Sequence, residues 1–398
     1  MPPNTTRILD IASGANHTVL LLETRSIAGN FELELWGSGD GSSGQLGPVH
    51  RQLLEAGSST TVFRPLGLPI SQLGLSGYKP RMISASWETT YIVFSHEINS
   101  DVLVSMGKDD FGDLGVGGGN GRAKGKGKEK IERASLNIVS FAHLIVDGFL
   151  LGDAALAFRS IEAGQHHVLV HFDVTLGDCI KSCIAGWGAS RHGQLGAVFG
   201  KDGKPVPYLP SPTLVTINDD ITYIALGNQH TVLLNKSGKV LGLGSNRKGQ
   251  LQRLEQLEDA THIGCTWNGT YVITGKTQGT TQIHAMGSGM HGQLGRLHAS
   301  AIQDPGTTVE LDTAFCWNIS LACGTEHILA LLSLSPAPAA PEVWGWGWNE
   351  HGNLGTGKTD DISVPVKLWP PVSTENDDSP RALRIWAGCG TSWIFTTS

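Results

Sequence analysis

Hydrophobic residues gather in short runs that alternate with polar, glycine-rich turns along the whole chain. A typical run covers residues 18–22 (TVLLL), where β-branched and aliphatic side chains continue for too short a distance to make a stable helix. No stretch of convincing length repeats its apolar residues with the 3.6-residue period of an amphipathic helix. The pattern therefore predicts an all-β fold of many short antiparallel strands.

The first of two repeated motifs has an apolar residue, a small residue three positions later, a polar residue and then a β-rich run. Clear copies read IASGANHTVLLL from Ile11 and IEAGQHHVLVHF from Ile161. Seven copies start 39 to 78 residues apart, a regularity that chance does not produce. They start at Ile11, Ile83, Ile161, Ile224, Ile263, Leu321 and Ile385.

The second motif is an aromatic or apolar residue, a glycine, a short polar turn and Gly-Gln-Leu-Gly or a close variant. The copy WGASRHGQLG contains Gly188 and Gly193, which permit positive φ angles and close chain approach where a turn meets a strand. Each copy follows a copy of the first motif, so the two alternate. The six copies start at Trp36, Met106, Trp187, Leu243, Met286 and Trp346.

This alternation predicts a seven-bladed β-propeller that forms one domain over residues 1–398. One small antiparallel sheet cannot bury both of its faces, whereas seven sheets stacked around an axis can. The first motif occurs seven times and the second only six times. Either the ten N-terminal residues replace the missing strand, or the sequence starts after it, so the closure of the ring stays open.

Composition and charge narrow the range of functions. The 29 Lys and Arg residues are outnumbered by 36 Asp and Glu residues, which argues against a protein that mainly grips a phosphate backbone. The opening MPPNTTRILD is not a secretory leader, and no apolar run approaches the ~20 residues that cross a bilayer. We therefore expect a cytoplasmic and nuclear protein that binds neither nucleic acid nor membrane directly.

One biased segment, residues 115–130 (GVGGGNGRAKGKGKEK), interrupts the repeats with glycine and lysine. Its composition predicts a disordered loop insertion. The alternative is a nucleic-acid or nuclear-import patch. The repeats resume beyond it, so the segment does not divide the chain into domains.

No motif indicates a catalytic, cofactor or metal site. The second motif lacks the Lys-Ser/Thr and the following helix of a phosphate-binding loop. Cys179 and Cys183 are the only close cysteine pair, and a zinc site normally needs a second pair. Four histidines recur at one place in the repeat, so they belong to different blades and are expected to bond a turn within their own blade: His17, His167, His230 and His327.

Together the two motifs resemble the regulator-of-chromosome-condensation repeat family, from about residue 8 to residue 398. Within that family the chain is similar to a small subgroup, the fungal killer-toxin-insensitivity propellers, also known as α-tubulin suppressors. One departure is that members of this subgroup start with a copy of the second motif. The similarity rests on residues 87–90 (WETT), 244–246 (GSN) with 250–252 (QLQ), 344–348 (WGWGW) with 350–353 (EHGN), and 388–394 (GCGTSWI).

The resemblance implies a non-enzymatic protein-binding propeller. Members of the subgroup form a heterodimer with a small CSL zinc-finger protein that binds zinc or iron. With that partner they support diphthamide biosynthesis on elongation factor two and Elongator-dependent tRNA wobble-uridine modification. The resemblance thus implies the CSL protein as partner, the Elongator complex as a further partner, and no cofactor held by this chain.

Four tryptophans lie in or next to turns, where they either pack in the core or anchor an interface. Trp36 and Trp187 begin copies of the second motif and are expected in the core. Exposed aromatic residues on a rigid scaffold are common anchors of protein interfaces, and neighbouring charged residues supply a polar rim. The predicted partner-binding residues are Trp87, Glu88, Asn246, Arg247, Lys248, Trp267, Trp348, Asn349, Glu350, His351 and Trp393.

A second hypothesis is a Ran-type guanine-nucleotide exchange factor or a chromatin-associated propeller. The best-known family member of that type uses a basic N-terminal tail and an inserted β-hairpin. The opening MPPNTTRILD is not basic and the chain is acidic overall, so the tail is not found. A third hypothesis, a propeller enzyme or lectin, has no motif behind it.

Overall fold

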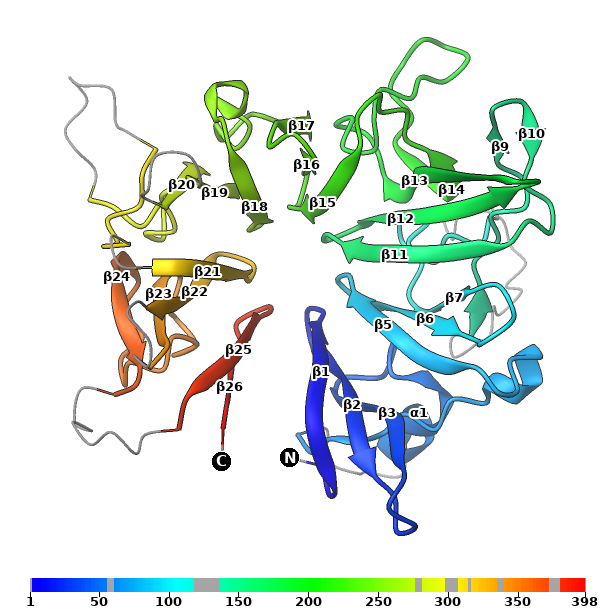
Figure 1. Ribbon diagram of the computed structural model, residues 1–398, viewed down its shortest axis with the longest axis horizontal. Coiled ribbons are helices and arrows are strands. Elements are labelled where there is room, and N and C mark those ends of the chain that lie inside the picture. The colour runs from blue at the N-terminus through cyan, green and yellow to red at the C-terminus, as the bar shows by residue number, and fades with distance from the viewer. Residues whose placement is uncertain are drawn as a thin grey trace. The chain divides into compact units, whose positions relative to one another are not determined.

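The computed structural model describes residues 2–55, 61–117, 136–275, 281–297, 307–313, 316–334, 340–371 and 380–397. Over these residues the fold is all-β, with one α-helix and two short 3-10 helices (Figure 1). No described helix is both long and apolar enough to cross a bilayer. The expected disorder of residues 115–130 falls almost wholly outside the described part. The helices are α1 (Gly47–Glu55), η1 (Ile70–Leu73) and η2 (Leu254–Gln256).

The chain divides into two compact units, Met1–Ile217 and Asn218–Ser398, and each is described by itself. The first unit holds three four-stranded antiparallel sheets and a separate two-stranded hairpin. The first two sheets are β1 (Thr5–Ser13), β2 (His17–Arg25), β3 (Phe31–Gly39) and β4 (Arg64–Pro65), then β5 (Lys79–Ala85), β6 (Thr89–Ser95), β7 (Val102–Gly107) and β8 (Asn137–Ile138). The hairpin is β9 (Ile145–Val146) and β10 (Phe149–Leu150), and the third sheet is β11 (Leu156–Ala163), β12 (His167–Leu176), β13 (Cys179–Ala189) and β14 (Tyr208–Leu214).

The second unit holds two three-stranded sheets, one four-stranded sheet and a final two-stranded sheet. The three-stranded sheets are β15 (Ile221–Leu226), β16 (His230–Asn235) and β17 (Val240–Gly244), then β18 (Ala260–Cys265), β19 (Gly269–Thr274) and β20 (Gln282–Gly287). The remaining sheets are β21 (Cys316–Cys323), β22 (His327–Leu334), β23 (Glu342–Gly347) and β24 (Ile362–Trp369), then β25 (Ala382–Ala387) and β26 (Ser392–Thr396).

The two sequence motifs correspond to fixed strands of each sheet. The first motif forms the first two strands, as in β1 and β2, and the second motif forms the third strand and the turn after it, as in β3. Since the chain holds six copies of the second motif, six sheets have three or four strands. The seventh copy of the first motif forms only β25 and β26. The expectation of seven complete blades is therefore not confirmed.

A tight backbone contact between the start of the second strand and the end of the third strand explains the glycine of the second motif. His17 at the start of β2 lies opposite Gly39 at the end of β3. Gly39 has φ +103°, and a Cβ there would lie 2.2 Å from the carbonyl oxygen of Asn16. Other residues therefore clash there and are strained as well. The same histidine–glycine register recurs at His167 opposite Gly188, His230 opposite Gly244 and His327 opposite Gly347.

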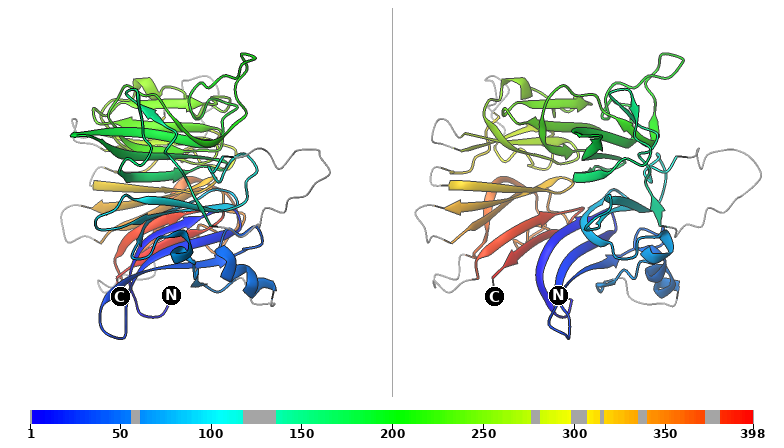
Figure 2. Two further views of the ribbon diagram at one scale, coloured as in Figure 1. Left: turned by 90° about the vertical axis from the view of Figure 1, so that its right-hand side faces the viewer. Right: turned by 45° about the vertical axis from the view of Figure 1, so that its right-hand side comes forward.

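Within each unit, neighbouring sheets pack face to face, and the core lies between them (Figure 2). In the first unit Tyr91 of β6 and Trp187 of β13 are fully buried, with ring centroids 6.0 Å apart. Both side chains donate 2.8 Å hydrogen bonds to the Asp113 carbonyl, so the buried polar atoms have partners. Trp187 is thus in the core as expected, whereas Trp36 is half-buried and donates from Nε1 to Glu34.

Candidate functional site

The recurring histidines join neighbouring sheets. His17 Nε2 on β2 lies 2.9 Å from Thr90 Oγ1 on β6 of the next sheet. Because the Thr90 hydroxyl donates to the Gln45 carbonyl at 2.7 Å, it accepts the hydrogen bond from His17. For His17, His230 and His327 the expectation of a bond to a turn in their own blade was wrong, since these three rings reach across to the next sheet. Two further links in the second unit are His230–Thr270 at 3.1 Å and His327–Ser392 at 3.0 Å.

Burial keeps these histidines neutral. His17 is 3% exposed, and desolvation lowers its pKa from 6.5 to about 4, a shift that the charge of Asp40 only partly opposes. The pKa values of His230 and His327 are likewise about 4 because of burial. Each ring lies against the glycine three residues earlier: a Cβ at Gly14 would lie 2.2 Å from His17 Cε1. The Gly-x-x-His spacing therefore makes room for a buried imidazole.

The turns between the first and second strands are also joined by backbone hydrogen bonds. In the first unit Ala15 N–H donates to the Trp87 carbonyl at 2.9 Å, and Trp87 N–H donates to the Gln165 carbonyl at 3.0 Å. In the second unit Asn228 donates to Trp267 at 3.0 Å, and Trp267 donates to Thr325 at 2.7 Å. Trp87 and Trp267 thus hold equivalent positions with a fixed backbone and half-buried side chains.

The glutamine of Gly-Gln-Leu-Gly holds the second-motif turn closed. Gln250 Oε1 accepts a hydrogen bond from the Lys248 backbone N–H at 2.8 Å. The leucine next to it packs beneath the third strand, where a Cβ on Gly242 would lie 2.8 Å from Leu251 Cδ2. Two other turns repeat the glutamine bond, His192–Gln194 at 3.0 Å and His291–Gln293 at 2.7 Å.

Side chains connect the two kinds of turn, which therefore share one end of each unit. Glu88 accepts a hydrogen bond from Ser43 Oγ of the neighbouring sheet at 3.1 Å and one from Lys108 Nζ of its own sheet at 2.7 Å. In the second unit Glu326 accepts from Asn268 at 2.6 Å and from Gln293 at 2.7 Å. We call this end of each unit, formed by the Gly-x-x-His turns and the second-motif turns, the loop face.

Trp348, Glu350 and His351 lie on the loop face of the second unit. The rings of Trp348 and His351 meet edge to face, with centroids 4.8 Å apart. Gly390 lies beneath them, because a Cβ there would be 3.1 Å from His351 and 3.6 Å from Trp348. Trp348 is half-buried, while Glu350 and His351 are exposed. This group comes closest to the aromatic anchor with a polar rim that the sequence predicts.

Asn349 is fully buried and supports this loop from inside. Its Nδ2 donates to the carbonyls of Lys358 and Asp360, and its Oδ1 accepts from Leu354 N–H at 2.9 Å. An interior side chain with these partners has no free surface to offer a ligand. Of the predicted contact residues, it is the one that the structure places away from the surface.

The other predicted residues occupy several turns. Asn246, Arg247 and Lys248 are exposed on the second-motif turn of the first sheet of the second unit. Asn246 Oδ1 caps Leu251 N–H at 2.8 Å, as Asn349 caps Leu354, so Asn246 is partly structural. Trp393 lies within β26 and is half-buried.

The sequence interpretation missed two exposed apolar residues on the loop face. Met290 is 78% exposed, next to His291, which binds Asp361 at 2.8 Å. Phe111 is 41% exposed and packs on His166 with ring centroids 4.7 Å apart. Both occupy the variable middle of a second-motif turn, and a single sequence gives no signal that separates an exposed turn residue from an ordinary one.

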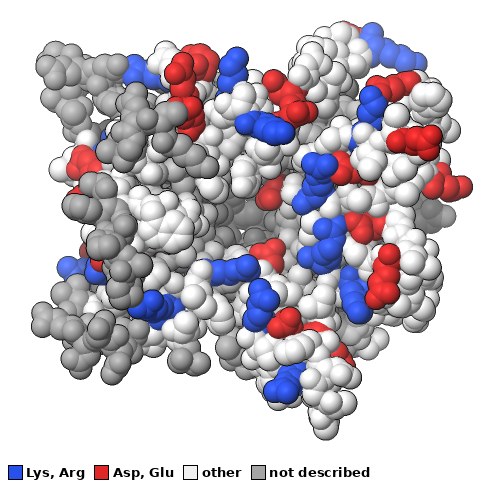
Figure 3. Space-filling view, in the orientation of Figure 1, with Lys and Arg blue, Asp and Glu red and all other residues white. Residues whose placement is uncertain are grey.

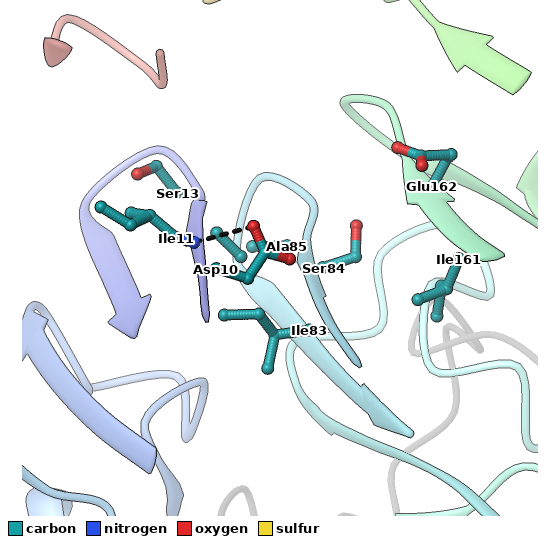
Figure 4. Close-up of a pocket in the computed structure, with 9 residues that line it drawn as sticks. Asp10, Ile11, Ser13, Ile83, Ser84, Ala85, Ile161 and Glu162 are labelled. Atoms are coloured by element: carbon teal, nitrogen blue, oxygen red, sulfur yellow. Dashed lines mark hydrogen bonds between the residues drawn. The ribbon is translucent and has the colours of Figure 1, made fainter. Parts of the chain in front are cut away.

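A polar cavity of about 250 Å³ opens among the first strands of the three sheets of the first unit (Figure 4). β1, β5 and β11 each supply part of its lining. Asp10 and Glu162 bring two carboxyl groups, and Ser13 and Ser84 bring hydroxyl groups. All of its lining except Asp10 lies at the start of three copies of the first motif, but the sequence did not reveal it, because its polar residues occupy motif positions that vary between copies and that no pattern marks as a site.

Among the residues that the structure describes, neither a group of metal-ligating side chains nor a patch of one charge indicates another binding site. These residues contain no group of three or more His, Cys, Asp or Glu side chains placed to hold a metal ion. All six cysteines are free thiols, with Cys179 exposed and Cys183 partly buried. Figure 3 shows basic and acidic side chains interspersed on the visible face, without a broad area of one sign.

Comparison with known proteins finds the same repeats. Models of the regulator of chromosome condensation (RCC1) repeat match residues 186–234, 221–250 and 342–392. The human probable E3 ubiquitin-protein ligase HERC3 is 31% identical over 194 residues, which cover 45% of this chain and only 17% of the ligase. The secretion-regulating guanine nucleotide exchange factor of Bos taurus is 26% identical over 324 residues, covering 73% of this chain and 60% of that protein.

Among solved structures, Prp20p from Saccharomyces cerevisiae superimposes with a TM-score of 0.65 at 18% identity, covering 99% of this chain and 83% of that chain. The sheets of this chain, its two alternating motifs and this structural similarity define a β-propeller protein. The repeats at residues 186–250 and 342–392 match the RCC1 repeat.

Proposed function

We propose that this chain is a non-enzymatic scaffold whose loop face binds another protein. The observation that carries the proposal is the contrast between fixed turn backbones and exposed turn side chains. Glutamine caps and Glu326 bridges fix the turns of the second unit, while Arg247, Lys248, Glu350 and His351 remain exposed. A rigid scaffold with variable exposed turns binds at low entropic cost.

The proposed partner is the small CSL zinc- or iron-binding protein, with the Elongator complex as a further partner. This assignment rests on the sequence resemblance at residues 87–90 and 344–353. It places the chain in diphthamide biosynthesis and tRNA wobble-uridine modification, in the cytoplasm and nucleus. We also propose that β25 and β26 are the inner strands of a seventh blade, which experimental coordinates with six blades would contradict.

A binding experiment with purified components tests the proposal. The chain is titrated with the metal-loaded CSL protein and, separately, with a Ran-type GTPase, and both affinities are measured by calorimetry. We expect saturable binding of the CSL protein that weakens when Trp348 is replaced by alanine. The proposal is contradicted if the chain binds neither protein. It is also contradicted if no loop-face substitution changes the affinity for the CSL protein.

The second candidate is guanine-nucleotide exchange, which one structural observation favours. The hairpin of β9 and β10 is inserted before the third sheet and exposes Ile145, Phe149 and Leu150 by 59%, 64% and 64%. An inserted hairpin is the feature that the exchange-factor hypothesis requires. Exchange is measured as release of a fluorescent GDP analogue from the GTPase, with the Phe149→Asp variant as the test of the hairpin. Release no faster than the spontaneous rate rejects this candidate.

A further inference from the structure

The polar cavity of the first unit is built from sheet edges. β1, β5 and β11 are each the first strand in their sheet, so each has one edge that pairs with no other strand of that sheet. Such an edge carries free backbone carbonyl and N–H groups. The volume of about 250 Å³ is several times the ~30 Å³ that one water occupies in the liquid, so the cavity has room for a polar group of several atoms.

Two carboxyl groups with different surroundings face this space. Asp10 accepts a hydrogen bond from the Ile11 backbone N–H at 2.9 Å. Glu162 is partly buried, and no hydrogen bond or ion pair joins its carboxyl group to another described residue. In Figure 4 this carboxyl group is directed toward the side where Ser84 and Asp10 lie. Burial and, secondly, the negative charge of Asp10 raise the Glu162 pKa from 4.5 to about 8.

This lining is complementary to a ligand that is positively charged and has several hydrogen-bond donors. Two carboxyl groups, the hydroxyl groups of Ser13 and Ser84 and the strand edges all offer acceptors. A guanidinium group carries five donors in a plane and pairs with carboxylates in two-point contacts. A bare metal ion fits less well, because the described residues provide no group of three acidic, histidine or cysteine ligands, and the cavity is larger than one ion fills.

We propose that the cavity binds a guanidinium group, with Asp10 and Glu162 as its carboxylate partners. The group belongs either to an arginine side chain of a protein segment or to a free arginine-like molecule. The site lies on the first strands of the sheets, so it does not depend on the partner proposed for the loop face.

Calorimetric titration of the full chain tests the site with N-acetyl-arginine methylamide as the probe. The matched control ligand is N-acetyl-citrulline methylamide, which has nearly the same shape but no charge. Loss of a charge-assisted hydrogen bond predicts at least about tenfold weaker binding of the citrulline compound. Free L-arginine separates the sources: its own carboxylate should weaken binding if the natural ligand is a peptide side chain, and strengthen it if the ligand is a free molecule.

Two variants connect the binding to the cavity. Glu162→Gln and Asp10→Asn keep the size of each side chain, and each should weaken arginine binding by about tenfold or more. The control is Glu258→Gln, an exposed position in the second unit, which should bind normally. Thermal unfolding of each variant confirms that it is folded. Near neutral pH the wild-type chain should also release a proton on binding, seen as a heat that depends on the buffer, because the cation favours ionised Glu162.

Four results would overturn the proposal. They are no saturable binding by the wild-type chain, equal affinity for the citrulline compound, unchanged affinity in both cavity variants, and equal loss in the Glu258→Gln control. A fifth is saturable calcium binding that disappears in Glu162→Gln without any arginine binding, which would make the cavity a metal site instead.

Discussion

His17 and Thr90 are 73 residues apart in the sequence, and their side chains meet at 2.9 Å between two neighbouring sheets. The Thr90 hydroxyl donates a hydrogen bond to the Gln45 carbonyl, so one residue of β6 contacts both β2 and the turn that follows β3. Equivalent links at His230 and His327 show that the histidine of the repeat holds successive sheets together.

Replacing Thr90 with valine should destabilise the first unit without changing its shape. The substitution keeps the volume but leaves His17 Nε2 and the Gln45 carbonyl without partners inside the protein. The expected loss is about 2 kcal/mol of unfolding free energy, measured by urea denaturation. Thr359→Val, at an exposed position, is the control and should change stability little. Equal stability of the two variants would show that the link contributes nothing.

Acid should destabilise the protein through its buried histidines. The folded-state pKa values of His17, His230 and His327 are lowered from 6.5 to about 4, so the unfolded chain binds protons first. The stability they contribute is complete above pH 6.5 and is lost as the pH falls toward 4. Urea midpoints between pH 7.5 and 4 measure the loss, and a His17→Gln variant should show a shallower decline. A flat profile over that range would contradict the buried neutral histidines.

Glu162 should produce the opposite dependence at higher pH. Its folded-state pKa is raised from 4.5 to about 8, so the folded chain holds a proton that the unfolded chain releases. This contribution is complete below pH 4.5 and is lost as the pH rises through 8. The wild-type chain should therefore lose stability relative to Glu162→Gln between pH 5 and pH 9. Parallel melting-temperature profiles for the two proteins would show that Glu162 ionises normally.

Trp348 and its neighbour Asn349 should behave oppositely when replaced by alanine. Truncation of a desolvated aromatic anchor costs ~2 kcal/mol or more, so Trp348→Ala should weaken CSL-protein binding roughly thirtyfold with a nearly unchanged melting temperature. Asn349→Ala should instead lower the melting temperature, because backbone groups of its loop lose their partners. A lower melting temperature with normal affinity in Trp348→Ala would place that tryptophan in the core.

The sequence alone was sufficient to predict those parts of the structure that depend on residues close together along the chain. The glycines, glutamine and leucine of the second motif predict a turn, and Gln250 and Leu251 close one in the structure. The alternation of the motifs correctly predicts successive antiparallel strands and a β-propeller, although its seven complete blades are not confirmed. These features are local, because φ preferences, strand runs and caps act within a few residues.

Tertiary structure decided everything that joins one repeat to another. Only the packed structure shows that the His17 ring contacts Thr90 in the next sheet and that Asn349 is buried beside the exposed Glu350. It also shows that β25 and β26 form a two-stranded sheet. It also brings Asp10 and Glu162, from separate repeats, to one cavity. The physical reason is that a repeated motif specifies its own strands and turns, whereas contacts across 70 or more residues depend on how the sheets pack against each other.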